Sequence, residues 1–547
     1  MARFRPSEHR PATRKKIALK SWLGIPAGAL VLVIVAYHLW PTVSGKPSRV
    51  NRQHFAGIPA RYSSLTLRPA SAGEGPAFTR TAVEADLDQL KWIIEHEYSY
   101  RDLKGVNYRA CLDAIRSGLG DGITRGDLAY QLAKVLALFG DGHSKVASKS
   151  LSIENLCSGF LPFLISESEG RLVAYTEDRA GFVDAAHPFV TKLDGVPVQK
   201  WIDAASQWVA AGSQRFVRLH SIRHLRDIAL LRQELGLAAG ESVRIELESA
   251  DHGIRKLIEL PLAKSKPNYG FWPAAGAPPR KLQEVQVATR RLDDNIGYIR
   301  IPIMLESPAF LASLVAAMHD CRKTAGLILD IRGNGGGSRA TLRTLFPFFV
   351  ADDQSPQVVN VAACRLGSKD RRADFQERYL YPVDSKRWSD AERQVIREFA
   401  ETFRPEWPLP EGMFSGWHYF LIGPDRHAGS YHYGKPVVIL QDSANFSAAD
   451  IFLGAFKGRK NVTLMGLPSG GGSGCRIEHR LENTRIAVYL SSMVSYRPDG
   501  QLYDGKGINP DIPIGPQPGF FVGKEDSVLD RAVQLLKEKG QVQSENR

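Results

Sequence analysis

A serine stands where a strand pattern gives way to a helix pattern, in Asp442–Phe452, "DSANFSAADIF", directly after the apolar stretch "KPVVIL". Such a turn exposes the Ser447 hydroxyl. The free N–H groups at the start of the helix, beginning with that of Ala448, favour negative charge on a nearby oxygen atom. The pattern therefore suits a nucleophile that attacks a carbonyl group. The alternative is an ordinary helix N-cap, a position that serine often takes.

A second candidate is the glycine run Gly335–Gly337 in "LILDIRGNGGGS", which follows an apolar strand pattern. Because glycine has no Cβ atom, the backbone N–H groups of such a run can turn toward a ligand. A phosphate cradle and a simple flexible turn are the alternatives. The P-loop form is excluded, because no Gly-Lys-Ser/Thr follows this run or the later "SGGGSG" at 469–474.

Together, "DIRGNGGG" and "SAADIF" resemble the tail-specific, or C-terminal processing, protease family of serine peptidases. In that family one strand ends in Asp-x-Arg-x-Asn-x-Gly-Gly, and a later strand leads to the nucleophile in a Ser-Ala-x-Glu/Asp-Ile-Phe turn. The resemblance covers roughly residues 77–515. It implies an α/β fold with a crotonase-like, mixed or mostly parallel catalytic core, and it makes Ser447 the nucleophile.

The family has two catalytic branches, and the motifs favour the branch without a lysine. One branch uses a Ser/Lys pair with the lysine in an "FGKG"-like segment, where this chain has "LPSGGGSG" and Gly472 at the lysine position. The other is similar to tricorn protease and the retinoid-binding-protein-like repeats. Its "DGHT" motif resembles "GDGHSKV", which supplies His143. Its "EGxGVxPDI" motif resembles "YDGKGINPDI", which supplies Asp504 where glutamate is usual.

The resemblance assigns a role to each of these side chains. His143 is the general base, because a histidine near its ordinary pKa can accept the serine proton and return it to the leaving amine. Asp504 orients the imidazole, with Asp141 as the alternative. Tricorn also uses a serine beside its histidine, and Ser144 is the candidate for that role here.

The resemblance also implies which groups bind the oxyanion and which cofactors are needed. The donors are the N–H of Gly336, with Gly335 next, and the N–H of Ala448. No metal, nucleotide or other cofactor is expected. Three histidines of a later segment have a spacing that matches no standard metal set, and we predict that they lie in a lid or at the surface: His418, His427 and His432.

The element that carries the base is a helical region, residues 77–154. "VEADLDQLKWIIEHEY" places Val83, Leu87 and Leu90 on one helix face. "TRGDLAYQLAKVLALF" has the same periodicity, with Thr124 as its N-cap. It stops at "GDGHSKV", which reads as a glycine turn into a strand. The histidine is thus expected directly after a helix.

Residues 155–265 are expected to form a β-rich module. "GRLVAYT" and "ESVRIELES" are short alternating or apolar runs separated by turns. "KLDGVPVQKWIDAA" reads as a strand, a tight Asp-Gly turn, a second strand and a helix. This order resembles a PDZ-like module, whose groove adds a peptide as an extra strand.

The elements that position the serine and the glycine run lie in residues 266–520, the catalytic core. Strand patterns such as "NIGYIRIPIM", "AGLILDIR" and "NVTLMG" alternate with helix patterns, which favours a mostly parallel sheet. Within the core, residues 351–433 are irregular and rich in aromatics and proline, and we predict a lid-like insertion. Residues 521–547 are expected to be a C-terminal helix and tail.

The N-terminus predicts a membrane anchor. Residues 1–21 are a basic, cytoplasmic tail, and residues 22–40 are long enough to cross a hydrocarbon core of about 30 Å, with tryptophan at both ends. A linker, 41–76, follows. We predict a single-pass protein whose catalytic part is exported, into the periplasm if the source is bacterial. A cleaved signal peptide is the alternative, although "VSG" is a poor cleavage site.

Composition excludes some functions and leaves others open. The net charge is +13, but residues 1–20 alone contribute +6 through seven basic residues and one glutamate, so no nucleic-acid surface is predicted. The five cysteines are widely spaced without a CxxC pair, which indicates neither a zinc site nor a disulfide framework.

The sequence thus predicts a membrane-anchored, exported serine endopeptidase that cleaves peptides or unfolded protein segments. Three alternatives remain open at this point. The first is a non-catalytic binding protein for a ligand or peptide on the same fold. The second is an esterase or amidase acting on small molecules. The third is a membrane scaffold whose PDZ-like module recruits partners. The sequence makes no prediction of the oligomeric state.

Overall fold

The computed structural model describes residues 77–151, 159–210, 212–270, 285–367, 369–424 and 431–545. Its central element is a six-stranded sheet with the order β10-β11-β12-β15-β16-β20. All neighbouring strands run parallel except β10 and β11, so the predicted mostly parallel sheet is confirmed. The strands are β10 (Ala288–Leu292), β11 (Ile296–Arg300), β12 (Gly326–Asp330), β15 (Val437–Gln441), β16 (Val462–Gly466) and β20 (Ile512–Pro513).

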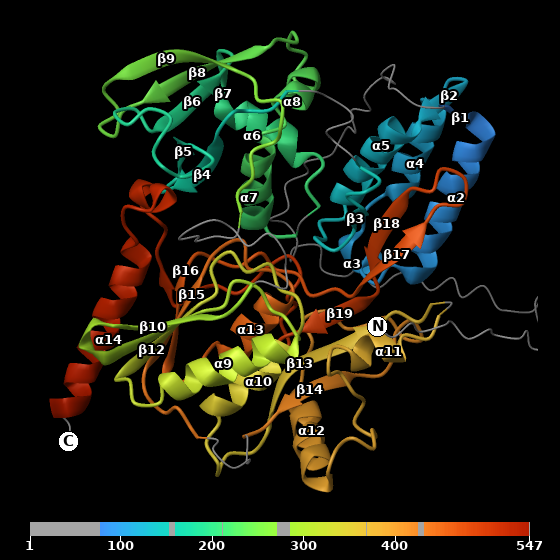
Figure 1. Cartoon of the computed structure of the whole chain (residues 1–547). Coiled ribbons are helices and arrows are strands. Elements are labelled where there is room, and N and C mark those ends of the chain that lie inside the picture. Colours follow the sequence, from blue (N-terminus) through green and yellow to red (C-terminus); the bar gives the residue numbers. More distant parts are fainter. Residues whose placement is uncertain are drawn as a thin grey trace, which may run out of the picture. The chain divides into compact units, whose positions relative to one another are not determined.

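Both faces of this sheet are buried, which explains why its strands read as continuous apolar runs. On β12, Leu327 and Leu329 face one core cluster and Ile328 faces the other. Figure 1 shows α14 on one side of the sheet, and α9 and α10 on the other. The covering helices are α9 (Pro308–Asp320), α10 (Ala340–Leu345), α13 (Ala448–Phe456) and α14 (Ser527–Glu545), with the short 3-10 helices η4 (Asp293–Asn295) and η5 (Phe346–Phe349).

The segment expected to be a lid instead builds a second sheet. Strand β13 (Gln357–Cys364) pairs with β14 (His418–Ile422) on one side and with β19 (Met493–Tyr496) on the other. Val359, Ala362 and Phe420 belong to the main core cluster. The segment is therefore part of the body of the fold, because its aromatic and β-branched residues are buried. Its helices are α11 (Arg372–Gln376) and α12 (Asp390–Thr402).

The first described residues of the chain contain several helices. In α2 (Arg80–Glu97) the residues Val83, Leu87 and Leu90 are buried, and α5 (Arg125–Ala137) begins at the N-cap Thr124, whose side chain accepts the N–H of Asp127. The chain then enters β3 (Lys145–Val146), which pairs with β18 (Ala487–Ser491) of the core, next to β17 (Arg476–Arg480). The remaining elements are β1 (Ala77–Thr79), β2 (Gly122–Thr124), α3 (Arg101–Lys104) and α4 (Tyr108–Ser117).

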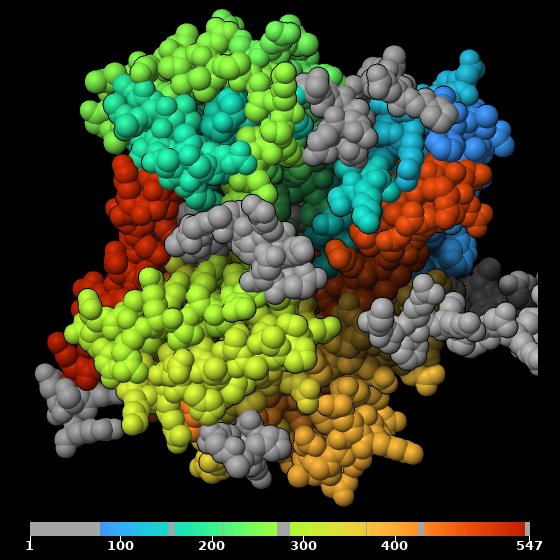
Figure 2. Space-filling model, viewed as in Figure 1, coloured from blue at the N-terminus to red at the C-terminus, as the bar shows by residue number. Residues whose placement is uncertain are grey.

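The β-rich module is an antiparallel sheet with the order β4-β5-β6-β8-β9, to which β7 adds beside β6. Figure 2 shows this module, in teal and green, against the red C-terminal segment, where Tyr175 stacks on Phe521 of η6 (Pro518–Val522). Its elements are β4 (Leu164–Ser168), β5 (Arg171–Tyr175), β6 (Phe189–Leu193), β7 (Val196–Pro197), α6 (Val198–Ser206), α7 (Gln214–His224), α8 (Ile228–Glu234), β8 (Ser242–Glu248) and β9 (Arg255–Pro261).

The expected membrane topology needs correction. Among the residues that the structure describes, no helix combines the length and the apolar character that crossing a bilayer requires. This finding contradicts the prediction of a single-pass membrane protein with an exported catalytic part. The stretch 22–40 on which that prediction was based lies outside the described residues, as does Cys157. The other four cysteines are free thiols.

Candidate active site

Ser447 occupies a strained turn between β15 and α13. Its backbone angles are φ 61° and ψ −118°, a region that residues with a Cβ atom rarely adopt. It is the N-cap residue of α13, yet its side chain makes no capping hydrogen bond. The ordinary N-cap alternative therefore does not describe this serine. The hydroxyl is directed elsewhere, as in the strand-turn-helix arrangement that presents nucleophilic serines.

One buried carboxylate holds this turn to a neighbouring glycine loop. Asp450 accepts hydrogen bonds from the hydroxyl of Ser469 at 2.5 Å and from the N–H groups of Gly471 at 3.2 Å and Gly472 at 3.0 Å. Burial raises the pKa of Asp450 to about 7, while the hydrogen bonds lower it. Since Asp450 lies in the first turn of α13, it ties the start of that helix to residues 469–472.

The glycine run lies against the serine. A Cβ atom on Gly336 would come within 3.0 Å of the Cβ of Ser447 and 2.8 Å of the backbone nitrogen of Ala448, so only glycine fits there. The N–H of Gly336 donates to Oδ1 of Asn334 at 2.8 Å, which differs from the expectation that this group faces the site. Within the described residues, the N–H groups of Gly335 and Ala448 have no hydrogen-bond acceptor.

The structure brings His143 and Ser447 together across 304 residues of sequence. Nε2 of His143 lies 3.1 Å from Oγ of Ser447. Asp141 fixes the loop, because its Oδ1 accepts the backbone N–H of His143 at 3.0 Å and its Oδ2 accepts the hydroxyl of Ser144 at 2.6 Å. The Ser144 oxygen in turn accepts the N–H of Ser491, at the end of β18, at 3.2 Å. Both functional side chains thus rest on hydrogen-bonded turns.

The surroundings of His143 favour its neutral form. The side chain is buried, with 7% exposure, and this burial is the main cause that lowers its pKa to about 4. The charge of Asp141 raises the pKa, whereas Lys145, Arg476 and Arg378 lower it further. A neutral imidazole at ordinary pH can accept a proton, as a general base must.

An aromatic stack packs against the imidazole ring. His143 stacks on Phe446 with 4.6 Å between ring centroids, and Phe446 stacks on Phe216 of α7 at the same distance. Cβ atoms on Gly142 and Gly472 would come within 2.5 Å and 2.4 Å of the Phe446 ring. Two glycines therefore make room for the ring that supports the histidine. Sequence periodicity gave no sign of this stack.

Asp504 does not meet His143 as expected. Its carboxylate pairs with Nζ of Lys104 at 2.5 Å, and both side chains are almost fully buried. Lys104 also donates to the carbonyl of Gly140 at 2.9 Å, at the base of the histidine loop. Burial raises the pKa of Asp504 to about 7, Lys104 lowers it, and Asp141 raises it. Nδ1 of His143 has no hydrogen-bond partner in the described part of the chain.

Lys104 is a site residue that the sequence did not reveal. It is the last residue of the four-residue helix α3, which Gly105 ends with φ 61°. A lysine at a helix C-terminus is ordinarily a solvated side chain that interacts with the helix dipole. Only the long-range contact with Asp504 distinguishes it, and no local pattern encodes such a contact.

Ser447 and His143 open into a cleft of about 930 Å³. The glycine run, the His143 loop, the 376–379 segment and the 473–476 segment line it. Its charged residues are Lys145, Glu306, Arg339, Glu377, Arg378 and Arg476.

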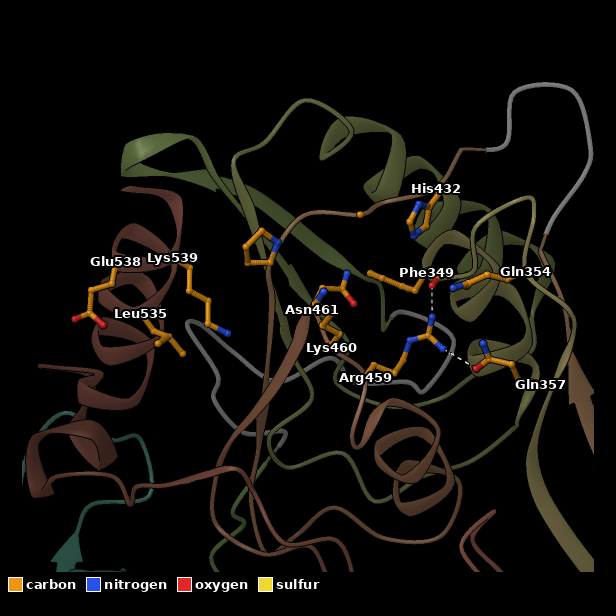
Figure 3. Close-up of a pocket in the computed structure, with 12 residues that line it drawn as sticks. Phe349, Gln354, Gln357, His432, Arg459, Lys460, Asn461, Leu535, Glu538 and Lys539 are labelled. Carbon is orange, nitrogen blue, oxygen red and sulfur yellow. Dashed lines mark hydrogen bonds between the residues drawn. The ribbon is translucent and has the colours of Figure 1, made fainter. Parts of the chain in front are cut away.

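A second hollow, of about 890 Å³, shares no lining residue with this cleft (Figure 3). There Arg459 donates to the carbonyl of Phe349 and to Oε1 of Gln357. His432 lines the hollow, whereas His418 lies on β14 and packs against Phe375 with the two rings tilted by 56°. The third histidine of that set, His427, lies outside the described residues.

The comparisons with known proteins agree with this geometry. Residues 295–514 match the model of peptidase family S41. Mature CPAF in complex with lactacystin has 15% sequence identity and a TM-score of 0.58, and the match covers 84% of this chain and 99% of that one. A crystal structure of a CPAF serine-to-alanine mutant has 16% identity and a TM-score of 0.60, over 85% and 98% of the two chains. At these identities the likeness shows a shared fold.

Two further results complete the comparison. The photosystem II D1 C-terminal processing protease has 14% identity and a TM-score of 0.38, over 79% of this chain and 92% of that one. No curated protein matches the chain significantly. The matched segment contains the serine turn and the glycine run, whereas His143 lies before it. The match of residues 295–514 to peptidase family S41 identifies the chain as a serine-type peptidase.

Proposed function

We propose that the chain is an endopeptidase of the Ser/His type, which cleaves peptides or unfolded protein segments through an acyl-enzyme on Ser447. The observation that carries the proposal is the 3.1 Å contact between Nε2 of His143 and the Ser447 hydroxyl. This distance suits direct proton transfer. The strained serine turn, whose hydroxyl makes no capping bond, supports the same role.

The proposed reaction has two halves. As Oγ of Ser447 forms a bond to the scissile carbonyl carbon, His143 takes the serine proton. It then gives that proton to the leaving amine as the C–N bond breaks. In the second half, water loses a proton to His143 and attacks the acyl carbon. The bond between that carbon and Oγ then breaks, and His143 returns the proton to Oγ, which releases the new carboxyl terminus and restores the serine. Here the N–H groups of Ala448 and Gly335 hold the oxyanion, since that of Gly336 is engaged with Asn334.

We assign the two carboxylates near His143 different tasks. Asp141 binds the backbone of His143, and its charge favours the imidazolium that forms during the reaction. Asp504 acts indirectly. It pairs with Lys104, and Lys104 donates a hydrogen bond to the Gly140 carbonyl at the base of the His143 loop. Asp504 is thus a positioning residue rather than a direct hydrogen-bond partner of the imidazole.

The surroundings of Gly472 support the Ser/His branch over the Ser/Lys branch. In the Ser/Lys branch this position carries the lysine, but here a Cβ atom on Gly472 would lie 2.4 Å from Phe446 and 3.5 Å from Nδ1 of His143. The space for a side chain is filled by the histidine and its stacking partner. The base therefore comes from the 77–154 region, and not from the loop after the serine.

The remaining architecture is proposed to follow the family. The parallel sheet and its helices are assigned to a crotonase-like core, and residues 155–265 to a PDZ-like module. The support is a groove of about 500 Å³ beside the sheet-edge strand β4 and helix α7, a position where a peptide can add as a strand.

The test is labelling of the full-length chain by a fluorophosphonate probe, combined with turnover of a quenched peptide. We expect labelling and turnover in the native chain, and loss of both in Ser447→Ala and His143→Ala. Thermal melting establishes that each variant is folded. Ester turnover without peptide turnover would instead favour an esterase. A folded native chain that is neither labelled nor active would favour a binding protein and would overturn the proposal.

A further inference from the structure

The cleft around Ser447 and His143 carries an excess of positive charge. Four cations reach it from different elements, namely Lys145 of β3, Arg339 before α10, Arg378 after α11 and Arg476 of β17. Two carboxylates, Glu306 and Glu377, offset half of this charge, which leaves a net charge of +2 in the cleft. The cleft thus differs from a neutral peptide-binding groove.

Arg339 is the most informative of the four. It is buried, with 5% exposure, yet its guanidinium meets only neutral acceptors. Nη1 donates to Oδ1 of Asn360 at 2.8 Å and to the Arg378 carbonyl at 3.3 Å, and Nη2 donates to Oγ of Ser473 at 3.4 Å. No carboxylate among the described residues forms an ion pair with it. Burial lowers its pKa to about 9, and repulsion by Arg378 contributes.

A buried cation without a counter-ion is unusual, because removing a charge from water is unfavourable unless an opposite charge compensates it. The arrangement is understandable if the counter-ion arrives with a ligand. Two further cations in the same cleft support this interpretation. Lys145 and Arg476 are exposed, and no described residue forms an ion pair with either of them. Arg476 lies over the ring of Tyr489 at 5.0 Å.

The two carboxylates of the cleft leave this charge largely uncompensated. Glu306 accepts the hydroxyl of Ser338 at 2.9 Å. Glu377 approaches Arg378 only to 4.0 Å, and its side chain is 76% exposed, so water screens the pair. Neither carboxylate forms an ion pair with Arg339.

The cationic wall lies close to the reacting bond. Arg339 follows the glycine run by two residues, and a Cβ atom on Gly336 would lie 3.0 Å from that of Ser447. Ser473, which binds the guanidinium, stands between Gly472 and Gly474, and Cβ atoms on both would come within 3.7 Å of His143. Arg339, Ser473, His143 and Ser447 all line the same cleft, so the guanidinium lies in the wall of the cavity that would hold the peptide on either side of the scissile bond.

We propose that Arg339, together with Lys145, Arg378 and Arg476, binds a carboxylate of the peptide substrate next to the scissile bond. This inference rests on the proposed peptidase function and specifies its substrate class. The carboxylate is either the side chain of a glutamate or aspartate or the free C-terminus of the substrate. Arginine suits the role because its planar donors match a carboxylate oxygen pair.

The experiment compares quenched peptides that share one backbone sequence and are incubated with the full-length chain. The first arm replaces one glutamine at a time by glutamate, from three residues before to three residues after the cut that mass spectrometry locates. The second arm keeps all glutamines and ends the peptide one, two or three residues after the cut, as a free acid or as an amide. We expect kcat/KM to rise by about tenfold or more at one position, since charge-assisted hydrogen bonds are stronger than neutral ones.

Variants identify the residues responsible. Arg339→Gln and Arg476→Gln should each reduce the preference for the carboxylate, and Arg339→Lys should retain part of it. Arg476→Glu should reverse it in favour of lysine-containing peptides. The matched control is Arg480→Gln, on the same strand but outside the lining of the cleft and paired with Glu478, which should leave the preference unchanged. If Arg339→Gln does not fold, Arg476→Gln and Arg476→Glu still test whether the cleft prefers a carboxylate.

Binding to Ser447→Ala separates the two proposals. Fluorescence anisotropy of the same peptides, without turnover, should show tighter binding of the acidic or free-acid form. A preference in the first arm assigns the subsite to a side chain, and a preference in the second arm assigns it to the terminus. Equal binding and equal turnover of all forms would overturn the subsite while the peptidase stands. Selective binding without turnover by the native chain would overturn the peptidase while the subsite stands.

Discussion

The serine turn, residues 442–450, and the histidine loop, residues 140–145, hold the two halves of the proposed catalytic pair in different ways. The serine turn is strained, with φ 61° at Ser447, and Asp450 fixes it through neutral donors only 19 to 22 residues away. The histidine loop depends on contacts with distant segments. Asp141 organises it locally, but the Lys104–Asp504 pair and the ring of Phe446 come from elsewhere in the chain.

This difference separates local strain from long-range anchoring. A turn that stores strain persists only when surrounding hydrogen bonds over-determine it, and Asp450 supplies them. A loop that is anchored by a buried ion pair is sensitive to the loss of either partner, because the other charge is then buried alone. Substitutions in the two regions are therefore expected to have different signatures.

The largest expected effect is the loss of catalysis when either Ser447 or His143 is replaced. Ser447→Ala and His143→Ala should each lower kcat by a factor on the order of 10⁴ to 10⁶, and the double variant should be no worse than the single ones, because the pair acts as a unit. Peptide turnover measures this, after the unfolding transition of each variant has been compared with that of the native chain. Activity retained in His143→Ala would show that His143 is not the general base.

The anchoring of the histidine loop is tested by Lys104→Met. The change leaves Asp504 buried without its cation and should lower the free energy of unfolding by about 3–5 kcal/mol. Lys104→Met combined with Asp504→Leu should recover part of this loss, because no charge is then left buried. Urea denaturation gives both values. If the two effects simply add, the pair is not coupled and the loop is held by other contacts.

The serine turn is tested by Asp450→Ala, which leaves one hydroxyl and two N–H donors without their acceptor. Each unsatisfied buried donor costs about 1–3 kcal/mol, less where water enters, so we expect about 2–4 kcal/mol of lost stability and a fall in kcat. Asp450→Asn keeps one acceptor oxygen, so its stability and kcat should lie between those of the native chain and those of Asp450→Ala. An unchanged unfolding midpoint for Asp450→Ala would show that strain at Ser447 needs no such support.

The pH dependence reports on the histidine loop. Burial lowers the pKa of His143 to about 4, so the base form persists down to that pH, and kcat/KM should decline only below about pH 5. The same shift contributes a loss of stability as pH falls from about 6.5 to 4, because the unfolded chain takes up the proton first. Arg476→Gln removes a charge that lowers this pKa, so it should move the acid limb of the pH–rate profile upward by a fraction of a pH unit.

The smallest effect is expected from the far end of the aromatic stack. Phe216→Leu keeps the apolar packing around Phe446 but removes one ring-on-ring contact, which is worth about 0.5–1.5 kcal/mol. We expect kcat to fall by a few-fold with the acid limb unchanged. Phe399→Leu provides the control, since it removes a stacked pair with Phe403 outside the cleft. Equal effects of both substitutions on kcat would argue against a specific role of the stack.

The sequence was informative where function depends on local pattern. The strand before Ser447, the turn and helix α13 follow each other within twenty residues, so apolar periodicity and small side chains predict them. The glycine run after β12 is predicted for the same reason. His143 was found through its motif. Neither the region 351–433, which builds a sheet, nor the partner of Asp504 was predicted, because strand pairing and buried ion pairs join residues that are far apart in the chain.

The Lys104–Asp504 contact also bears on biosynthesis. Synthesis proceeds from the N-terminal to the C-terminal side, so Lys104 and His143 leave the exit tunnel long before Asp504 is added, and domains generally fold as they emerge. A nascent chain has the histidine loop first, without its anchor, and the serine later. Under the proposed mechanism, cleavage activity is expected only after residue 504 has been added, which protects neighbouring nascent chains, and this one, from premature proteolysis.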